Sequence, residues 1–229
     1  MNDRVIDISR TGAATERNRV LRNTYNLLAL SMLPTVAGAW LGIQLNLAAA
    51  LATRPIMGLL LMLGVSFGLI FAIQAKRNSP VGVWLLLAFT FVMGLTMSNA
   101  LQHTLKFSNG GSLIAMAAGG TALIFFGMAT LATTIKRDLS GLGNFLFIGC
   151  LLLIAASLAN MFFHIPALHL TIAVIGCGLF SVWLMFDINR VVTGGETNYV
   201  SATLAIYLDL VNIFMNLLQI LGIFGGDRE

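Results

Sequence analysis

The placement of the charged residues constrains this chain more than any other feature of its sequence. Only 10% of its 229 residues are charged, and they gather in short segments between long apolar stretches. From Leu139 to Phe186 the chain contains no Asp, Glu, Lys or Arg. A soluble domain of this length carries about a quarter charged residues. With 58% hydrophobic residues and a mean hydropathy of +0.89, the sequence predicts an all-α integral membrane protein.

A membrane-spanning helix needs about 20 mostly apolar residues. Prolines, glycines and charged residues divide the apolar sequence into seven stretches of that length. The expected spans are residues 23–46, 55–75, 81–102, 112–135, 141–163, 166–187 and 201–223. The sequence therefore predicts a seven-helix bundle forming one membrane domain over residues 23–229, after a polar tail at residues 1–22. The last span contains Asp209, so a re-entrant or internal helix there is the alternative.

The basic residues indicate the orientation of the spans in the membrane. Ten of the 13 Lys and Arg residues lie in the tail and in the loops after the second, fourth and sixth spans. The positive-inside rule then places the N-terminus in the cytoplasm. The net charge of +4 does not predict nucleic-acid binding, because the basic residues follow the ends of apolar stretches. Cys150 and Cys177 lie inside such stretches, so no disulfide framework is predicted.

Two aspartates, Asp187 and Asp209, accompany the last two spans. A carboxylate at membrane depth costs about 3 kcal/mol on insertion scales, so it needs a proton, a cation or a polar partner. The two spans run antiparallel, and both aspartates can therefore face each other in the cytoplasmic half of the bundle. Two carboxylates in contact cannot both ionise easily and share a proton, and their oxygens suit Ca²⁺. This pattern favours a pH-sensitive cation site.

A polar stripe runs along the last span. Asn212, Asn216 and Gln219 follow Asp209 at offsets of 3, 7 and 10 residues, which places all four within roughly 80° of one helix face. On an otherwise apolar helix such a stripe should turn away from lipid.

Structural interpretations of these polar residues remain open. Asp187 can be a solvated helix end with Arg190 as its local partner, and Asp209 can be a permanently protonated packing group. Glu196 is expected in a loop or cap after the double glycine at 194–195. The three histidines are expected at the outer interface, without metal-ligand spacing: His103, His164 and His169.

No catalytic motif is present in the sequence. It contains no HExxH, GxSxG, P-loop or CxxC pattern, so neither an enzyme nor a bound cofactor is predicted. Intramembrane aspartyl proteases also use two aspartates. However, Asp187 lacks the YD context and Asp209 lacks the GxGD context of that class.

Several segments of the chain are typical of one protein family. The most specific is FDINRVVTGGETNYVSATLAIYLDLVNIF at 186–214. The others, spread over nearly the whole chain, are VLRNTY at 20–25, GGTALIFF at 119–126, RDLSGLG at 137–143, PALHL at 166–170 and NIFMNLLQILG at 212–222. In these segments the chain resembles the Bax-inhibitor (TMBIM) family of seven-helix membrane proteins, and within it the bacterial YccA-like branch named as modulators of the FtsH protease.

The resemblance implies a bundle with the seventh helix at its centre and a pH-sensitive Ca²⁺ leak. Family members with a di-aspartyl sensor place it on the sixth and seventh helices, at positions that match Asp187 and Asp209. A basic latch at the end of their second helix corresponds to Lys76, next to Arg77. Two functions follow as hypotheses for a bacterial inner-membrane protein. One is a proton-gated Ca²⁺ leak, and the other is modulation of an FtsH-type membrane protease through residues 1–22 and helix faces.

Overall fold

The computed structural model describes residues 2–47, 55–135 and 137–226. All regular secondary structure in these residues is helical, which suits a lipid environment because a helix satisfies its own backbone polar groups. The helices are α1 (Asn2–Gln44), α3 (Pro55–Lys76), α4 (Pro80–Thr104), α5 (Gly110–Thr134), α6 (Leu142–Phe163), α7 (Pro166–Thr193) and α8 (Tyr199–Gly225).

Local sequence sets most of the helix ends. Three helices begin at Pro55, Pro80 and Pro166, where the missing N–H of proline costs nothing because the first turn leaves that group unbonded. α7 ends at Gly194, whose φ of 86° is a left-handed conformation that glycine adopts without strain. Five of the seven predicted spans agree with α3, α4, α5, α6 and α8 to within two residues at each end.

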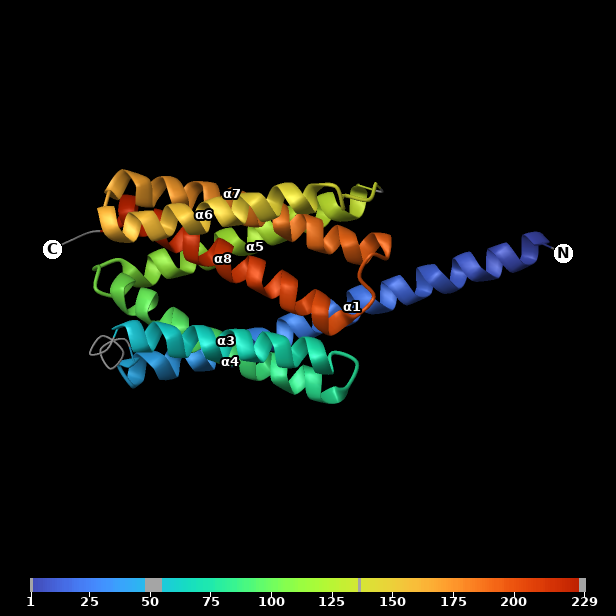
Figure 1. Cartoon of the computed structure of the whole chain (residues 1–229), viewed down its shortest axis with the longest axis horizontal. Coiled ribbons are helices and arrows are strands. Elements are labelled where there is room, and N and C mark those ends of the chain that lie inside the picture. Colours follow the sequence, from blue (N-terminus) through green and yellow to red (C-terminus); the bar gives the residue numbers. More distant parts are fainter. Residues whose placement is uncertain (1, 48–54, 136, 227–229) are drawn as a thin grey trace.

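Two predicted boundaries are wrong. The span expected to end at Asp187 continues as α7 to Thr193, because nothing breaks a helix before Gly194. The first helix begins at Asn2 rather than at residue 23. Residues 2–22, expected as a tail, contain one glycine and no proline, and they form the start of α1 that extends beyond the other helices (Figure 1).

Six helices in the described part of the chain are long and apolar enough to cross a membrane: α1, α4, α5, α6, α7 and α8. The exception is α3, whose described apolar part is the shorter stretch Leu60–Lys76. The span that carries Asp209, for which a re-entrant helix was the alternative, is a continuous helix of 27 residues. At 1.5 Å per residue α8 is about 40 Å long, longer than the ~30 Å hydrocarbon layer.

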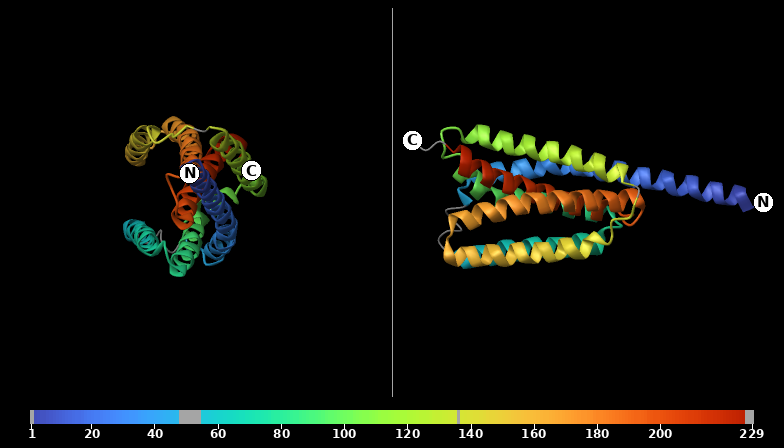
Figure 2. Two further views of the ribbon diagram at one scale, coloured as in Figure 1. Left: turned by 90° about the vertical axis from the view of Figure 1, so that its right-hand side faces the viewer. Right: turned by 90° about the horizontal axis from the view of Figure 1, so that it is seen from above.

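The helix α8 lies among the others rather than at the edge of the bundle. It packs against α1, α3, α4, α5 and α7, whereas α6 packs only against α7 among the described helices. Figures 1 and 2 show α8 running obliquely between a layer that contains α6 and α7 and a layer that contains α3 and α4. α8 contributes eleven buried residues and α6 only Leu146, which places the polar residues of α8 inside the bundle.

The most extensive helix–helix contact among the described residues joins α1 and α4, and glycines let the two backbones approach closely. A Cβ atom at Gly38 would overlap the backbone carbonyl of Phe91, and one at Gly94 would overlap that of Thr35. Small residues at such crossings let backbones meet in a membrane, where the hydrophobic effect does not drive helices together.

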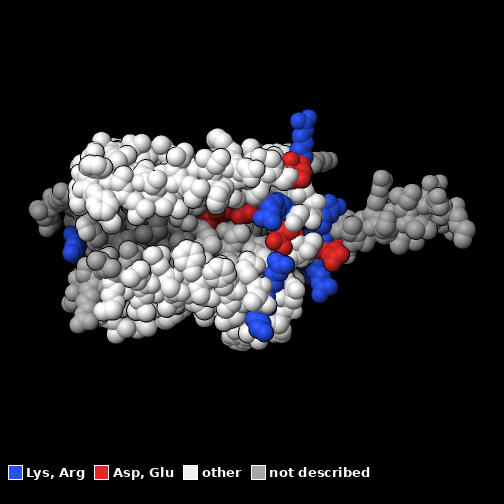
Figure 3. All heavy atoms as spheres, in the orientation of Figure 1, with Lys and Arg blue, Asp and Glu red and all other residues white. Residues whose placement is uncertain are grey.

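Basic side chains gather at the end of the bundle from which α1 extends, here called the basic end (Figure 3). The described basic side chains there are Arg17, Arg19, Arg22, Lys76, Arg77, Arg137 and Arg190. Lys106, which follows α4, is the one described Lys or Arg side chain at the opposite end. The described charges therefore have the asymmetry that the sequence predicted.

Candidate functional site

The structure brings the two predicted aspartates together between α7 and α8. Asp187 is 9% exposed and Asp209 is 5% exposed. The two carboxyl groups lie close enough to interact electrostatically. The two aspartates therefore lie together, as predicted, and Asp187 is not a solvated helix end, because α7 continues past it.

One carboxyl oxygen of the pair has no hydrogen-bond partner among the described residues. Asp209 Oδ2 is buried and accepts no hydrogen bond from any described residue. The other such side-chain atom in the described part of the chain is Nε1 of Trp183, which lies four residues before Asp187 on α7. Buried polar groups are normally satisfied, so the unpaired oxygen of Asp209 is unusual. The Trp183 indole lies instead beside Cys150 of α6 and against the Phe186 ring.

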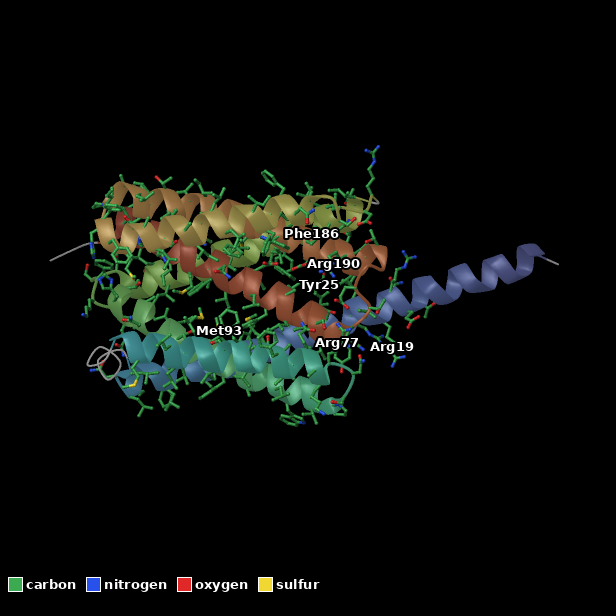
Figure 4. All side chains as sticks on the ribbon, viewed as in Figure 1. Arg19, Tyr25, Arg77, Met93, Phe186 and Arg190 are labelled. Atoms are coloured by element: carbon green, nitrogen blue, oxygen red, sulfur yellow. The ribbon has the colours of Figure 1, made fainter. Side chains whose placement is uncertain are left out.

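The basic partner of the pair is Arg190, one turn after Asp187 on α7. Its Nη1 lies 3.5 Å from Asp187 Oδ1, and its Nη2 lies 3.9 Å from Glu196 Oε2. Its guanidinium carbon also lies 5.8 Å from the ring centre of Phe186 (Figure 4). The sequence proposed Arg190 as a local partner only in the structural interpretation of Asp187, and that pairing is confirmed.

The two latch candidates are placed differently from each other. Arg77 lines a pocket of about 250 Å³ together with Asp187 and Arg190, whereas Lys76 does not line it. Among the described residues neither Lys76 nor Arg77 forms an ion pair with an aspartate. The ion pair to Asp187 comes instead from α7 itself, because Arg190 is fixed three residues away on the same helix.

The pocket lies at the basic end, where the α7–α8 loop meets α3. Glu196 lines it and accepts a hydrogen bond from the Asn198 backbone N–H at 2.8 Å, so it is the loop residue that the sequence predicted. Ser201 Oγ donates to Gln74 Oε1 at 3.0 Å across the pocket wall. Figure 3 shows acidic side chains at the bottom of a hollow between the two helix layers, beside basic ones.

Asn198 holds this end of α8 in place. Its Oδ1 accepts from the backbone N–H groups of Val200 and Ser201, each at 3.0 Å, which caps the helix. Its Nδ2 donates to the carbonyl of Arg77 at 3.0 Å and to Asn78 Oδ1 at 2.8 Å. One side chain therefore fixes the end of α3 against the start of α8, beside the pocket.

Three residues of the polar stripe, Asn212, Asn216 and Gln219, are half-buried, and two of their amides bond to the α8 backbone rather than to the aspartates. Asn212 Nδ2 donates to the carbonyl of Leu208, and Asn216 Nδ2 donates to that of Asn212, both at 2.8 Å. Asn216 also sits over Gly176 of α7, where a Cβ atom would lie 2.9 Å from its Nδ2. Asn216 and Gln219 line a separate pocket toward the opposite end of the bundle.

The three histidines lie in two different surroundings. His103 is exposed and packs edge-on against Phe107, with ring centres 6.0 Å apart, whereas His164 and His169 line the same pocket as Gln219. The described residues contain no group of three or more His, Cys, Asp or Glu side chains able to hold a metal ion. Cys150 and Cys177 are free thiols.

The fold and the site together define an all-helical polytopic membrane protein with a carboxyl pair buried between two long helices. Residues 17–226 match the family described as inhibitor of apoptosis-promoting Bax1, so the chain belongs to the Bax inhibitor family. A relative in Neisseria meningitidis is 39% identical over 220 residues, which cover 95% of this chain and 96% of the relative.

Three further relatives carry names that refer to a protease or to a membrane. The Escherichia coli protein named modulator of FtsH protease YccA is 35% identical over 226 residues, covering 98% of this chain and 100% of its own length. A Vibrio cholerae relative, described as an uncharacterized membrane protein, is 36% identical over 213 residues, covering 93% of this chain and 92% of its own. A second Escherichia coli relative is named inner membrane protein YccA.

Proposed function

We propose that the protein is a pH-sensitive cation leak of the bacterial inner membrane, with Ca²⁺ as the transported ion and Asp187 and Asp209 as its sensor. The observation that carries this proposal is the carboxyl pair itself, with both side chains less than a tenth exposed and in contact between two long apolar helices. Ionisable groups within membrane segments are rare, and they mark ion paths or proton relays.

The chemistry follows from the asymmetry of the pair. Arg190 stabilises a negative charge on Asp187, so a single shared proton is held by Asp209. When this proton leaves, two negative charges face each other at close range. A cation entering from the pocket or a movement of Arg190 relieves the repulsion, and either event changes the path for ions. The exchange of a proton for a cation makes the flux depend on pH.

The pair supplies few ligands for a resident ion. Ca²⁺ takes six to eight oxygen ligands, and two carboxylates offer at most four. No third acidic, His or Cys side chain joins them among the described residues. An ion at the pair therefore keeps part of its water and binds weakly, which suits passage rather than storage.

The proposed topology has seven crossings, with α3 as the second, α8 at the centre and the N-terminus in the cytoplasm. It is supported by the gathering of described basic side chains at the basic end and by the packing of α8 against five other helices. In this orientation the pocket beside Asp187 opens to the cytoplasm. Labelling of single cysteines placed at residues 78 and 108 with an impermeant reagent from each side tests the orientation.

The test of the leak is Ca²⁺ efflux from proteoliposomes between pH 6 and 8. The wild type is expected to show a pH-dependent flux that is lost in Asp209→Asn, since an amide cannot exchange a proton. Asp138→Asn is the matched control, because Asp138 is exposed at the basic end and its hydrogen bonds within the described part of the chain come from Ser140. No flux above empty liposomes from correctly folded wild-type protein would exclude the leak.

A second function, modulation of an FtsH-type membrane protease, is favoured by a different observation. The Escherichia coli relative that matches along its whole length is named for that activity. In this chain the part of α1 that extends beyond the other helices offers a surface for such a partner at the basic end. Deletion of residues 1–22 is expected to impair co-purification with the protease and to leave the flux intact, whereas Asp209→Asn should do the reverse.

A further inference from the structure

A second polar pocket lies at the end of the bundle opposite the aspartates. It has a volume of about 660 Å³ and is formed by α6, α7 and α8. This pocket is here called the far vestibule. Its polar lining residues are Ser157, Asn160, His164, His169, Asn216 and Gln219. A cavity of similar size between α1, α4, α5 and α8 has a lining that is almost entirely apolar. The polarity of the far vestibule is therefore not a general property of gaps in this bundle.

The far vestibule reaches well below the ends of its helices. Ser157 lies six residues before the end of α6, and Asn216 lies nine residues before the end of α8. At 1.5 Å per residue these positions are about 9 Å and about 13 Å inside, a large part of one half of the ~30 Å hydrocarbon layer. Polar groups at such depth, such as the Asn216 amide, require hydrogen-bonding partners, and a roomy polar cavity provides them by admitting water.

The deepest residue of the far vestibule lies close to the aspartate pair along α8. Asn216 follows Asp209 by seven residues, about 10 Å, and Asn212 lies between them. The Asn216 amide donates to the carbonyl of Asn212, and both residues belong to the polar stripe. Because Asn216 lies over the Cβ-free surface of Gly176, its side chain fits between α7 and α8 at this depth.

The electrostatics of the far vestibule favour a cation. Its described lining contains no Lys or Arg, and its amide and hydroxyl oxygens are acceptors. The C-terminal ends of α6 and α8 and the N-terminal end of α7 meet at this end of the bundle. Two negative helix ends outweigh one positive end.

The geometry points to the far vestibule as a second aqueous site, which admits small hydrated cations from the outer side to Asn216. The buried barrier between the two sides of the membrane is then the short stretch of α8 around Asp209 and Asn212. That ions cross the membrane through the far vestibule rests on the proposed function. The presence of water in the far vestibule, and the preference of this site for cations, do not rest on it.

Thiol accessibility tests the far vestibule without any flux measurement. In a background of Cys150→Ala and Cys177→Ala, Ser157→Cys and Leu158→Cys are compared in proteoliposomes. These neighbours lie at the same depth on α6 and both are exposed, but Ser157 lines the far vestibule whereas Leu158 does not. An impermeant cationic thiosulfonate applied from the outer side is expected to modify Ser157→Cys at least ten-fold faster than Leu158→Cys, and faster than an anionic reagent does.

Equal rates at the two positions, or a faster reaction with the anionic reagent, would overturn the inference. Ca²⁺ flux in Gly176→Ala, with Gly178→Ala as control, provides the second measurement. A Cβ at Gly176 meets the Asn216 amide, whereas one at Gly178 meets nothing within 4 Å. If the reagent modifies Ser157→Cys but the wild type shows no flux, the far vestibule is supported and the leak is excluded. If the wild type shows flux but Ser157→Cys is not modified, the leak is supported and the far vestibule is excluded.

Discussion

The ion pair between Asp187 and Arg190 allows a quantitative prediction for the pH dependence of the flux. At 3.5 Å, Coulomb's law gives about 5 kcal/mol with an effective dielectric constant of about 20, and about 1 kcal/mol in bulk water. The Arg190 side chain is 39% exposed, so solvent screening places the stabilisation toward the lower value, about 1–2 kcal/mol. One pH unit corresponds to about 1.4 kcal/mol. Arg190→Gln should therefore move the midpoint of the flux by about one unit.

The direction of this shift follows from the charges. Arg190 favours the ionised form of the pair, so its removal makes the proton harder to lose and moves the midpoint to higher pH. Arg77→Gln is the matched control, because Arg77 lines the same pocket but forms no ion pair with a described aspartate. The assay is Ca²⁺ efflux from proteoliposomes in steps of half a pH unit, accompanied by the infrared carboxyl stretch as a direct measure of protonation.

Three results are informative. A shift confined to Arg190→Gln in both flux and infrared titration supports the assignment. Equal shifts for the two arginine variants would refute it, because the effect would then reflect the overall charge of the basic end. An infrared shift without a flux shift would support the ion pair but exclude a role for it in gating.

Two further predictions concern stability, measured as the free energy of unfolding in detergent. Gly38→Ala should destabilise the protein by about 1–3 kcal/mol, because the new methyl group meets the α4 backbone. Gly68→Ala, with nothing within 4 Å, should not, and equal losses would contradict the close α1–α4 packing. Asn198→Ala should cost about 1–2 kcal/mol through loss of the α8 cap and increase proteolysis near residues 194–198. Unchanged stability and cleavage would show that the cap is dispensable.

Several features of the fold were predictable because their causes are local. Apolar stretches long enough to cross a bilayer, bounded by Pro55, Pro80 or Pro166, fixed most helix ends within two residues. The boundary at Asp187 was wrong because a single carboxylate does not break a helix. Its burial depends on α8 packing over it, which no local pattern reveals.

The candidate site shows the same division. The period of 3.6 residues placed Asp209, Asn212 and Asn216 on one face, and the antiparallel order of the last two helices allowed Asp209 to meet Asp187. The basic side chain that pairs with the aspartates was harder to predict from the sequence. Lys76 and Arg77 matched a pattern in related sequences, but the ion pair comes from Arg190, because a charge on the same helix has a fixed distance whereas one on α3 depends on helix packing.

By itself, the sequence determined that this is a helical membrane protein, where most helices begin and end, and which polar residues share one face of α8. These follow from hydrophobic length, backbone hydrogen bonding and helical period, all properties of a single segment. Only the tertiary structure decided that Arg190 pairs with Asp187, that α3 is attached through Asn198, and that His164 shares a pocket with Asn216. Apolar helix faces are nearly interchangeable in lipid, so the choice between them depends on how small and polar side chains fit across each interface.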